Sequence, residues 1–377
     1  MQYRPFGKTV FNVSALGFGA MRMPFLDGDM RKIDEPRAIE MIRAAIDGGV
    51  NYIDTAYVYH GGASEALVGR ALKDGYRARV KTATKMPVWM VNSRADMDRF
   101  LDQQLQRLDD TVIDYYLLHS LDRGSWARMR SLGAMRWAEL QIKKGRIGHI
   151  GFSFHGGYDA FRDICDGYGW EFCQVQYNYM DTAEQAGRRG VRYAAAKGMA
   201  VIVMEPLKGG KLAAPPEQVK AILDAGAATR SPAGWALQWL WDQPEVSLVL
   251  SGMSDLAQVR ENLELADQAP VPFTAGDHRT IERVRTAYNR ITAVKCTDCK
   301  YCLPCPRGVD IPRNFALYND GYRYGTFRNG SFVYWMWMKE AGRAANCNAC
   351  GACEKKCPQR IRIRAELKKV TEAFARP

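Results

Sequence analysis

Eight of the ten cysteines lie between Cys296 and Cys357, in two sets with short and regular gaps. The first set reads Cys296-x2-Cys299-x2-Cys302-x2-Cys305 and is followed by proline. The second set reads Cys347-x2-Cys350-x2-Cys353-x3-Cys357 and is also followed by proline. A secreted, disulfide-bonded chain would distribute its cysteines more evenly, whereas clusters of this kind in a cytosolic chain are typical of metal binding. The spacing therefore predicts two sets of thiolate ligands near the C-terminus.

The second set has the spacing of the bacterial ferredoxin run, in which three cysteines bind one [4Fe–4S] cluster and the fourth binds a neighbouring cluster. The first set departs from that run by one residue before Cys305. We therefore expect two [4Fe–4S] clusters with crossed ligands. One would be bound by Cys296, Cys299, Cys302 and Cys357, and the other by Cys305, Cys347, Cys350 and Cys353. The alternative is a pair of zinc ribbons, but zinc sites usually show two separated Cys-x2-Cys pairs.

Four residues capable of acid–base chemistry lie at or just after the ends of predicted strands: Asp54, Tyr59, Lys85 and His119. The C-terminal ends of the strands in a parallel barrel meet at one mouth, where such enzymes carry their active sites. A buried aspartate or lysine is costly unless it is paired, so an Asp54–Lys85 ion pair is expected in a structural as well as a catalytic role. The order of the four residues along successive strands favours a catalytic site.

The elements that would position these residues alternate along the chain up to about residue 270, as short apolar runs and amphipathic stretches of helical length. We predict strands at 15–20, 50–54, 79–84, 113–118, 148–153, 172–177, 200–204 and 246–250. We predict helices at 36–47, 64–74, 94–108, 126–143, 187–197, 217–225, 231–241 and 255–266. Eight βα units in about 250 residues predict a (β/α)8 TIM barrel. A doubly wound sheet is the competing fold, but Gly17-Phe18-Gly19-Ala20-Met21 is not its phosphate-binding G-x-G-x-x-G turn.

The pattern changes after the barrel, and we predict a second domain. Residues 1–274 would form the α/β barrel, and residues 275–377 a small C-terminal dicluster ferredoxin-like domain with helices at 277–293 and 361–375. A domain of this size has little hydrophobic core, so its clusters are expected to hold it together.

Charge and hydropathy limit the classes of partner. The formal net charge is +12, but Lys and Arg are scattered without a block of like charges, which argues against nucleic-acid binding. Two oxidised cluster sites would contribute about −4 and leave about +8, a balance suited to a phosphorylated cofactor or to an acidic redox partner such as a ferredoxin or flavodoxin. No apolar run is long enough to span a membrane, and the first residues lack a secretory h-region, so we expect a cytoplasmic protein.

The segment Asp54-Thr55-Ala56-x-x-Tyr59, followed by Lys85 and His119, resembles the catalytic tetrad of the aldo/keto reductase family. The resemblance extends from about residue 3 to residue 267, and the C-terminal domain is similar to that of a branch with an appended dicluster module. It implies that Tyr59 is the general acid, that Lys85 lowers the pKa of Tyr59, and that His119 orients a substrate carbonyl. A hydride from a nicotinamide would then reach the carbonyl carbon while Tyr59 donates the proton.

The same resemblance implies a site for NADP(H) or NAD(H). Ser153 and Gln176 would bind the nicotinamide carboxamide, and Leu207 and Gly209 would lie over the pyrophosphate. The adenosine half would contact four residues, Ser251, Gly252, Gln258 and Asn262. The family often places a lysine and an arginine on the 2′-phosphate at the positions of Gly252 and Gln258, so Arg260, Lys208 or Lys211 would have to replace them. The chain departs from the family at two further positions: Phe154 replaces an asparagine near the nicotinamide, and Met204 replaces the aromatic residue that stacks on its ring. Trp89 is expected to form a wall of the substrate pocket.

These observations favour an NAD(P)H-linked oxidoreductase that reduces a small carbonyl compound or oxidises an alcohol. Its two [4Fe–4S] clusters would serve electron transfer, redox sensing or structure. The sequence shows no flavin signature that would convert a hydride into single electrons for the clusters. The alternative is an iron–sulfur electron-transfer protein whose barrel is a non-catalytic or regulatory nucleotide-binding module. A zinc-stabilised nucleic-acid-binding protein would rest on charge alone.

Overall fold

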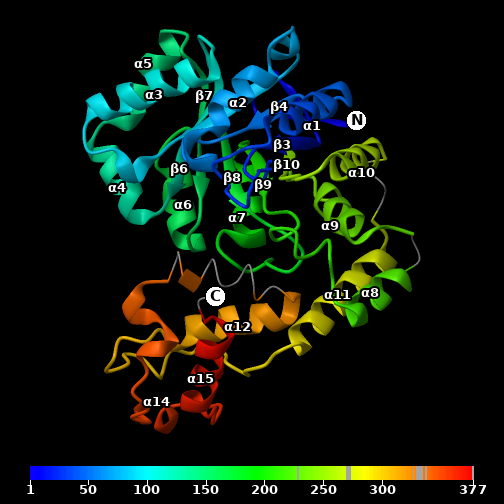
Figure 1. Ribbon diagram of the computed structural model, residues 1–377. Helices are drawn as coiled ribbons and strands as arrows, with labels where there is room; N and C mark the ends of the chain where they lie inside the picture. The colour runs from blue at the N-terminus through cyan, green and yellow to red at the C-terminus, as the bar shows by residue number, and fades with distance from the viewer. Residues whose placement is uncertain (227–228, 269–272, 326, 328–333, 336–337, 376–377) are drawn as a thin grey trace. The chain divides into compact units, whose positions relative to one another are not determined.

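The computed structural model describes residues 1–226, 229–268, 273–325, 327, 334–335 and 338–375. Eight parallel strands close into a barrel in the order β10-β3-β4-β5-β6-β7-β8-β9 (Figure 1). Their bounds are β3 Leu16–Gly19, β4 Tyr52–Asp54, β5 Lys81–Met86, β6 Ile113–Leu121, β7 Ile147–Phe154, β8 Phe172–Gln176, β9 Ala200–Met204 and β10 Leu248–Ser251. The predicted (β/α)8 barrel is confirmed.

Helices follow the strands as the βα pattern requires. Their bounds are α1 Glu35–Asp47, α2 Ser64–Ala71, α3 Arg94–Leu108, α4 Arg123–Ser131, α5 Ala134–Lys143, α6 Tyr158–Asp166, α7 Gly187–Ala196, α8 Glu217–Asp224, α9 Pro232–Trp241 and α10 Leu256–Asp267. The single helix predicted at 126–143 is instead divided into α4 and α5, because Gly133 adopts a left-handed φ of 72°. The helix α6 was not predicted. Three short 3-10 helices lie on connecting segments, η1 Tyr59–Gly62, η2 Tyr76–Arg79 and η3 Val88–Met90.

An antiparallel hairpin of β1 (Tyr3–Pro5) and β2 (Asn12–Ser14) precedes the barrel. Between its strands, Phe6 is fully buried and packs against Tyr115 with the ring centroids 4.7 Å apart. Phe6 also contacts the ring of Phe172, whose centroid lies 5.7 Å away. These aromatic side chains belong to a core cluster drawn from several strands. The hairpin therefore seals one end of the barrel with apolar side chains.

The remaining elements are α11 Ala275–Arg290, α12 Ile311–Tyr324, η4 Glu340–Gly342, η5 Ala344–Asn346, α14 Ala352–Lys355 and α15 Ile363–Ala373. Residue contacts divide the chain into a barrel unit, Met1–Gly209 with Ala233–Thr274, and a terminal unit, Gly210–Pro232 with Ala275–Pro377. The terminal unit includes Ala275, where the sequence predicts the second domain to begin, and also Gly210–Pro232, which lies inside the predicted barrel domain. No helix within the described ranges is long and apolar enough to cross a bilayer.

The terminal unit has a small hydrophobic core of its own. Phe315, Leu367 and Val370 are almost completely buried in it, and they come from α12 and α15. Six of the eight clustered cysteines pack against this core: Cys296, Cys302, Cys305, Cys347, Cys353 and Cys357. The core therefore supports the cysteine loops from one side.

Candidate functional site

Three of the four predicted acid–base residues are joined by direct contacts at the C-terminal end of neighbouring strands. Asp54 ends β4, Lys85 lies in the adjacent β5, and Tyr59 begins the short helix η1. The Lys85 Nζ donates to Asp54 Oδ1 at 2.6 Å and lies 3.4 Å from the Tyr59 hydroxyl. The side chains of Lys85 and Asp54 are 1% and 3% exposed, so this is a buried ion pair with a phenol beside its cation.

Burial controls the protonation of this group. It raises the pKa of Tyr59, and the nearby Lys85 cation acts in the opposite direction without reversing the shift. The net direction is therefore opposite to that expected from Lys85 alone, because the phenol is removed from water and the phenolate loses its hydration. Burial also opposes the charge of Lys85, but attraction to Asp54 and Tyr59 outweighs this and raises the pKa of Lys85. At neutral pH the site holds a protonated phenol next to an ammonium group.

His119 completes the group from β6. A register shift between Leu118 and Leu121, with Ser120 at a φ of 56°, forms an irregularity in the strand at this residue. Such irregularities re-aim side chains. The His119 ring lies 6.2 Å from the Tyr59 ring at an interplanar angle of 83°, and 5.1 Å from the ring of Trp89. Burial, followed by the charge of Lys85, lowers the pKa of His119, so its imidazole is neutral.

The Nδ1 atom of His119 is buried without a hydrogen-bond partner among the described residues. A buried polar atom without a partner carries a desolvation cost, and such atoms cluster where a ligand completes the bonding. Trp89 beside it is 47% exposed, and its place in the wall of a substrate pocket stays a prediction. The four predicted residues thus lie close together, and one buried nitrogen of His119 makes no hydrogen bond to a described residue.

A buried network that the sequence analysis did not identify supports the tetrad from outside. Glu65 on α2 is fully buried, and its carboxylate accepts bonds from Thr84 Oγ1 at 2.6 Å and from Gln104 Nε2 at 2.7 Å. The same Gln104 nitrogen donates to the carbonyl oxygen of Lys85 at 3.1 Å. Arg107 forms an ion pair with Glu65. No pattern in the sequence indicates that this glutamate is buried. Its role in fixing the end of β5 follows only from its hydrogen bonds and its ion pair in the structure.

His60, next to Tyr59, is a second feature of the site. It adopts a left-handed φ of 52°, which is costly for a residue with a side chain. Its Nδ1 lies 2.7 Å from the carbonyl oxygen of Met30, in the loop after β3. This contact ties Tyr59 to that loop, which also carries the exposed side chain of Met21.

The residues predicted for the nicotinamide end, buried Ser153 and half-buried Gln176, are already hydrogen-bonded. Ser153 on β7 accepts a bond from the Ser120 N–H at 2.7 Å. Gln176, at the end of β8, donates from Nε2 to Asp181 at 3.0 Å and accepts from Gln185 at 2.7 Å. Both side chains are therefore held in fixed orientations before any ligand binds.

The residues predicted for the adenosine half lie around β10 and α10. Ser251 ends β10, and its Oγ accepts a bond from Asn262 Nδ2 at 2.9 Å. Gln258 bonds to Ser254 and Asp255 and so closes the start of its own helix. Leu207 and Gly209 lie in the loop after β9, where Lys208, Gly209 and Gly210 all have positive φ values. The sequence prediction thus places these residues on two neighbouring loops, and their roles stay predictions.

Of the cations proposed to replace the missing phosphate contacts, two are engaged elsewhere. The Lys208 Nζ is 2.7 Å from both oxygens of Asp181. The Lys211 Nζ lies 3.5 Å from Asp320 within the terminal unit. Arg260 on α10 is exposed. The sequence analysis did not consider Arg22.

Arg22 follows β3 and reaches the two predicted nucleotide loops. A methyl group placed on Gly252 would lie 3.2 Å from its Cδ, and one on Gly209 would lie 3.0 Å from its Nη2. Its side chain forms no hydrogen bond or ion pair with another described residue. Only the order of strands β3, β10 and β9 around the barrel reveals this proximity. The Arg22 guanidinium, which no described carboxylate neutralises, thus lies beside Gly209 and Gly252. Such a cation suits a phosphate group.

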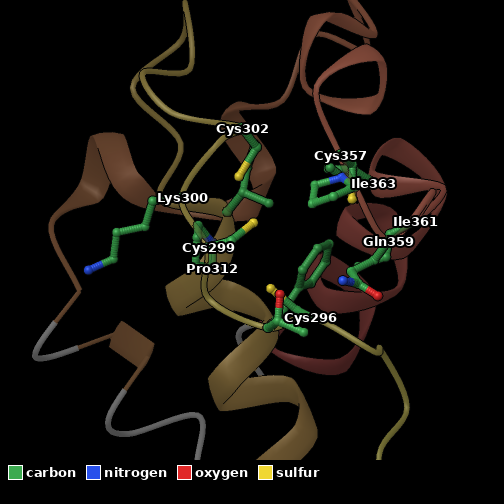
Figure 2. Close-up of a pocket in the computed structure, with 13 residues that line it drawn as sticks. Cys296, Cys299, Lys300, Cys302, Pro312, Cys357, Gln359, Ile361 and Ile363 are labelled. Atoms are coloured by element: carbon green, nitrogen blue, oxygen red, sulfur yellow. The ribbon is translucent and has the colours of Figure 1, made fainter.

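The cysteines of the terminal unit surround a cavity. Figure 2 shows the sulfur atoms of four residues facing this space, Cys296, Cys299, Cys302 and Cys357. Its walls are otherwise largely apolar and include Pro312 and Phe315 of α12 and Ile363 of α15. No three metal-ligating side chains among the described residues converge closely enough to hold a single ion. The four cysteines around the cavity are the set that the spacing assigns to one crossed cluster.

The cysteines of the other set lie on the same unit, with Cys305, Cys347 and Cys353 half-buried and Cys350 exposed. Burial raises the pKa of Cys302 to about 11, so the free thiol is protonated and becomes a thiolate ligand only with a cation to stabilise it. Arg364 pairs with Glu354 at 2.8 Å beside this set and fixes the start of α15 against α14. These cysteines therefore suit an iron–sulfur cluster, whose iron ions would stabilise the thiolates, better than a site with no bound cation.

Comparisons with known proteins match both parts of the chain. Residues 15–285 match the model of the Aldo/keto reductase family, and residues 295–361 match that of the 4Fe-4S dicluster domain. An L-galactose dehydrogenase of Arabidopsis thaliana is 28% identical over 285 residues, which cover 70% of this chain and 87% of the relative. A human aflatoxin B1 aldehyde reductase, member 4, is 25% identical over 303 residues, 67% of this chain and 88% of the relative.

Solved structures share the barrel. The holo form of an aldo-keto reductase from Bacillus halodurans aligns with a TM-score of 0.64 at 24% identity, covering 75% of this chain and 96% of that one. A Klebsiella pneumoniae aldo-keto reductase in complex with NADPH aligns with a TM-score of 0.60 at 21% identity, over 76% of this chain and 96% of that one. The barrel, its tetrad and the two family matches together show that this chain belongs to the aldo/keto reductase family, as an NAD(P)-dependent oxidoreductase with a C-terminal 4Fe-4S dicluster domain.

Proposed function

We propose that the chain reduces a small carbonyl compound, or oxidises the corresponding alcohol, with Tyr59 as the general acid or base. The contact of the Tyr59 hydroxyl with the buried Lys85–Asp54 pair carries this proposal. NAD(P)H supplies a hydride when it is bound. The protein's own part is to hold a protonated phenol beside a cation that stabilises negative charge on the phenol oxygen after the proton has left.

His119 and Trp89 would orient the substrate. A neutral His119 offers a hydrogen-bonding nitrogen to a carbonyl oxygen, and its buried Nδ1 has no partner among the described residues. Trp89 provides an exposed aromatic face 5.1 Å from the imidazole. The names of the two relatives, a sugar dehydrogenase and an aldehyde reductase, indicate that this family works on both alcohols and carbonyls. Such a site fits either direction of the reaction.

The nucleotide would be bound by residues at or just after the C-terminal ends of β7 to β10. Ser153 and Gln176 present fixed polar groups for a carboxamide, and Leu207 and Gly209 lie on the loop predicted for the pyrophosphate. Arg22 would supply the cation that Gly252 and Gln258 do not. A guanidinium between these loops would suit the 2′-phosphate of NADP(H), or the pyrophosphate that NADP(H) and NAD(H) share.

The cysteines would hold two [4Fe–4S] clusters in the crossed arrangement. The cavity lined by Cys296, Cys299, Cys302 and Cys357 supports this assignment, since Cys357 comes from the second set. Bound clusters supply one-electron chemistry. The positive charge of the chain favours an acidic protein as the electron partner, such as a ferredoxin or flavodoxin.

Anaerobically purified protein allows a direct test. We expect about eight irons and eight sulfides per chain, binding of a nicotinamide nucleotide, and NAD(P)H oxidation with a member of a panel of small aldehydes, ketones and quinones. Full clusters and nucleotide binding without turnover of any carbonyl or alcohol would instead favour an electron-transfer protein with a regulatory barrel. Stoichiometric zinc in place of iron would overturn the cluster assignment.

A further inference from the structure

Asp181, which no motif identifies, lies at the centre of the hydrogen bonds at the barrel mouth. It belongs to the loop after β8 and is only 6% exposed. One of its oxygens accepts bonds from Gln176 Nε2 and from Asn178 Nδ2, both at 3.0 Å. Both oxygens lie 2.7 Å from the Nζ of Lys208. A single carboxylate thus bonds to side chains from the ends of two neighbouring strands.

The first arm of this network fixes the amide of Gln176. Its Nε2 donates to Asp181, and its Oε1 accepts from Gln185 Nε2 at 2.7 Å. With one oxygen and one nitrogen bond made on defined sides, the amide cannot flip without losing both. An amide retains a second N–H and a second lone pair, which remain for a ligand in a set direction.

The second arm holds a strained loop. Glu205 and Lys208 adopt left-handed φ values of 55° and 49°, and Gly209 and Gly210 follow at 69° and 90°. The left-handed conformation is unfavourable for a residue with a side chain, so the surrounding contacts must hold the loop in this shape. Those contacts are the Asp181–Lys208 ion pair and a bond from Asn178 Nδ2 to the Glu205 carbonyl at 3.2 Å.

The ion pair also determines the charge at the loop. Lys208 is 17% exposed, and the carboxylate beside it neutralises its charge, so its role is to anchor the loop rather than to bind a phosphate. The anchor is local, since Asn178 accepts bonds from the backbone N–H groups of Met180 and Asp181 at 3.0 Å and closes the turn on which Asp181 sits. Asp181 is therefore held rigidly itself.

We propose that Asp181 is a positioning residue for two parts of the nicotinamide nucleotide: it orients the Gln176 amide for the nicotinamide and holds the Lys208–Gly209 loop for the pyrophosphate. The inference rests on the proposed function. It adds a residue that touches no ligand and yet sets the geometry of two ligand contacts at once.

The test compares Asp181→Asn with wild type in direct binding of NADPH and of NADH, by the fluorescence of the bound nicotinamide. The variant removes the charge facing Lys208 and one of the acceptor oxygens. We expect the nucleotide Kd to rise at least about tenfold, since the partly buried Lys208 ammonium no longer faces a carboxylate and the loop loses this ion pair. The KM of the carbonyl substrate and the kcat at saturating nucleotide should stay within about threefold, because Tyr59 and Lys85 are not touched.

Asp166→Asn is the matched control. Asp166 also pairs with a lysine, Lys197, at 2.6 Å in the barrel unit, but that pair is exposed and remote from the predicted nucleotide residues. Its nucleotide Kd should equal that of wild type. If Asp181→Asn does not fold, Lys208→Met tests the same arm and should raise the nucleotide Kd similarly.

The outcomes separate the inference from the proposed function. A nucleotide Kd for Asp181→Asn within about twofold of wild type, or a loss of kcat without a change in Kd, would overturn the positioning role. An equal loss in Asp166→Asn would also overturn it, because the effect would then be general destabilisation. Wild-type protein that binds neither NADPH nor NADH would contradict the proposed function itself.

Discussion

The barrel mouth and the cysteine cavity prepare their chemistry in different ways. At the mouth, Asp54 and Lys85 are at most 3% exposed and are held by strands whose register is set around the whole barrel. In the terminal unit, Cys299 is exposed and Cys296 and Cys302 are half-buried on a segment without helix or strand. The first site is organised by packing before any ligand arrives. The second lies on irregular loops beside a small core, so a bound ligand would contribute more to its order.

The largest effect is expected from Tyr59→Phe, which should affect the barrel mouth and not the cysteine cavity. The substitution removes the proton donor and leaves the ring, so kcat/KM for carbonyl reduction should fall by about 10²- to 10⁴-fold. The iron content should not change. Tyr57→Phe is the control, because the Tyr57 hydroxyl bonds to Gln103 at 2.9 Å and not to the tetrad. Undiminished turnover in Tyr59→Phe would remove this residue from the mechanism.

Paired cysteine substitutions test the crossed ligands. If Cys302 and Cys357 bind the same cluster, Cys302→Ser with Cys357→Ser removes one cluster and leaves about four irons per chain. If Cys353 binds the other cluster, Cys353→Ser with Cys357→Ser removes both and leaves almost none. Iron and sulfide analysis gives the answer, and the opposite pattern would mean uncrossed sets. The NADPH affinity of the barrel should survive in the first pair.

Arg22→Ala tests whether the guanidinium of Arg22, just after β3, contacts the bound nucleotide. Losing one charge-assisted bond at an exposed position should raise the NADPH Kd about five- to tenfold. The Kd of wild type should also rise more steeply with salt than that of the variant. Arg136→Ala, an exposed position on α5, is the control. Equal Kd values and equal salt dependence for Arg22→Ala and wild type would exclude the contact.

The smallest effect is expected from pH. The pKa of Tyr59 is raised above its usual 10.0 by burial, and that of His119 is lowered below its usual 6.5 by burial and by Lys85. At every pH between these two pKa values, Tyr59 is therefore protonated and His119 is neutral, which is the state that carbonyl reduction requires. At saturating substrates kcat should change by less than about twofold from pH 6.5 to 9. A step in kcat near pH 6.5 would show that His119 titrates normally.

The same shift has a consequence for stability. Below pH 6.5 the unfolded chain takes up a proton at His119 that the folded barrel does not, so the free energy of unfolding should fall as the pH decreases.

The two regions also differ in how far their residues could be predicted. The cysteines are close together in the chain and share a regular spacing, and the tetrad residues follow strand ends, so local patterns identified both. Asp181, Arg22 and Glu65 were not predicted, because their contacts join loops or helices that are distant in the sequence and follow no short pattern. The direction of the Tyr59 pKa also required the structure, because the depth of burial outweighs a neighbouring charge that the sequence does show.

The grouping of Gly210–Pro232 with the terminal unit has a consequence for where the two modules could be separated. Within that unit, α8 packs on α11, and Arg230 pairs with Asp277 at 2.9 Å with both side chains almost buried. A chain cut after Thr274 would keep α8 but lose α11, and the apolar face of Val219 and Leu223 would meet water. The Aldo/keto reductase match extends to residue 285, inside α11. A barrel separated from the dicluster domain would therefore have to keep α11, and the cut would have to fall after Arg290.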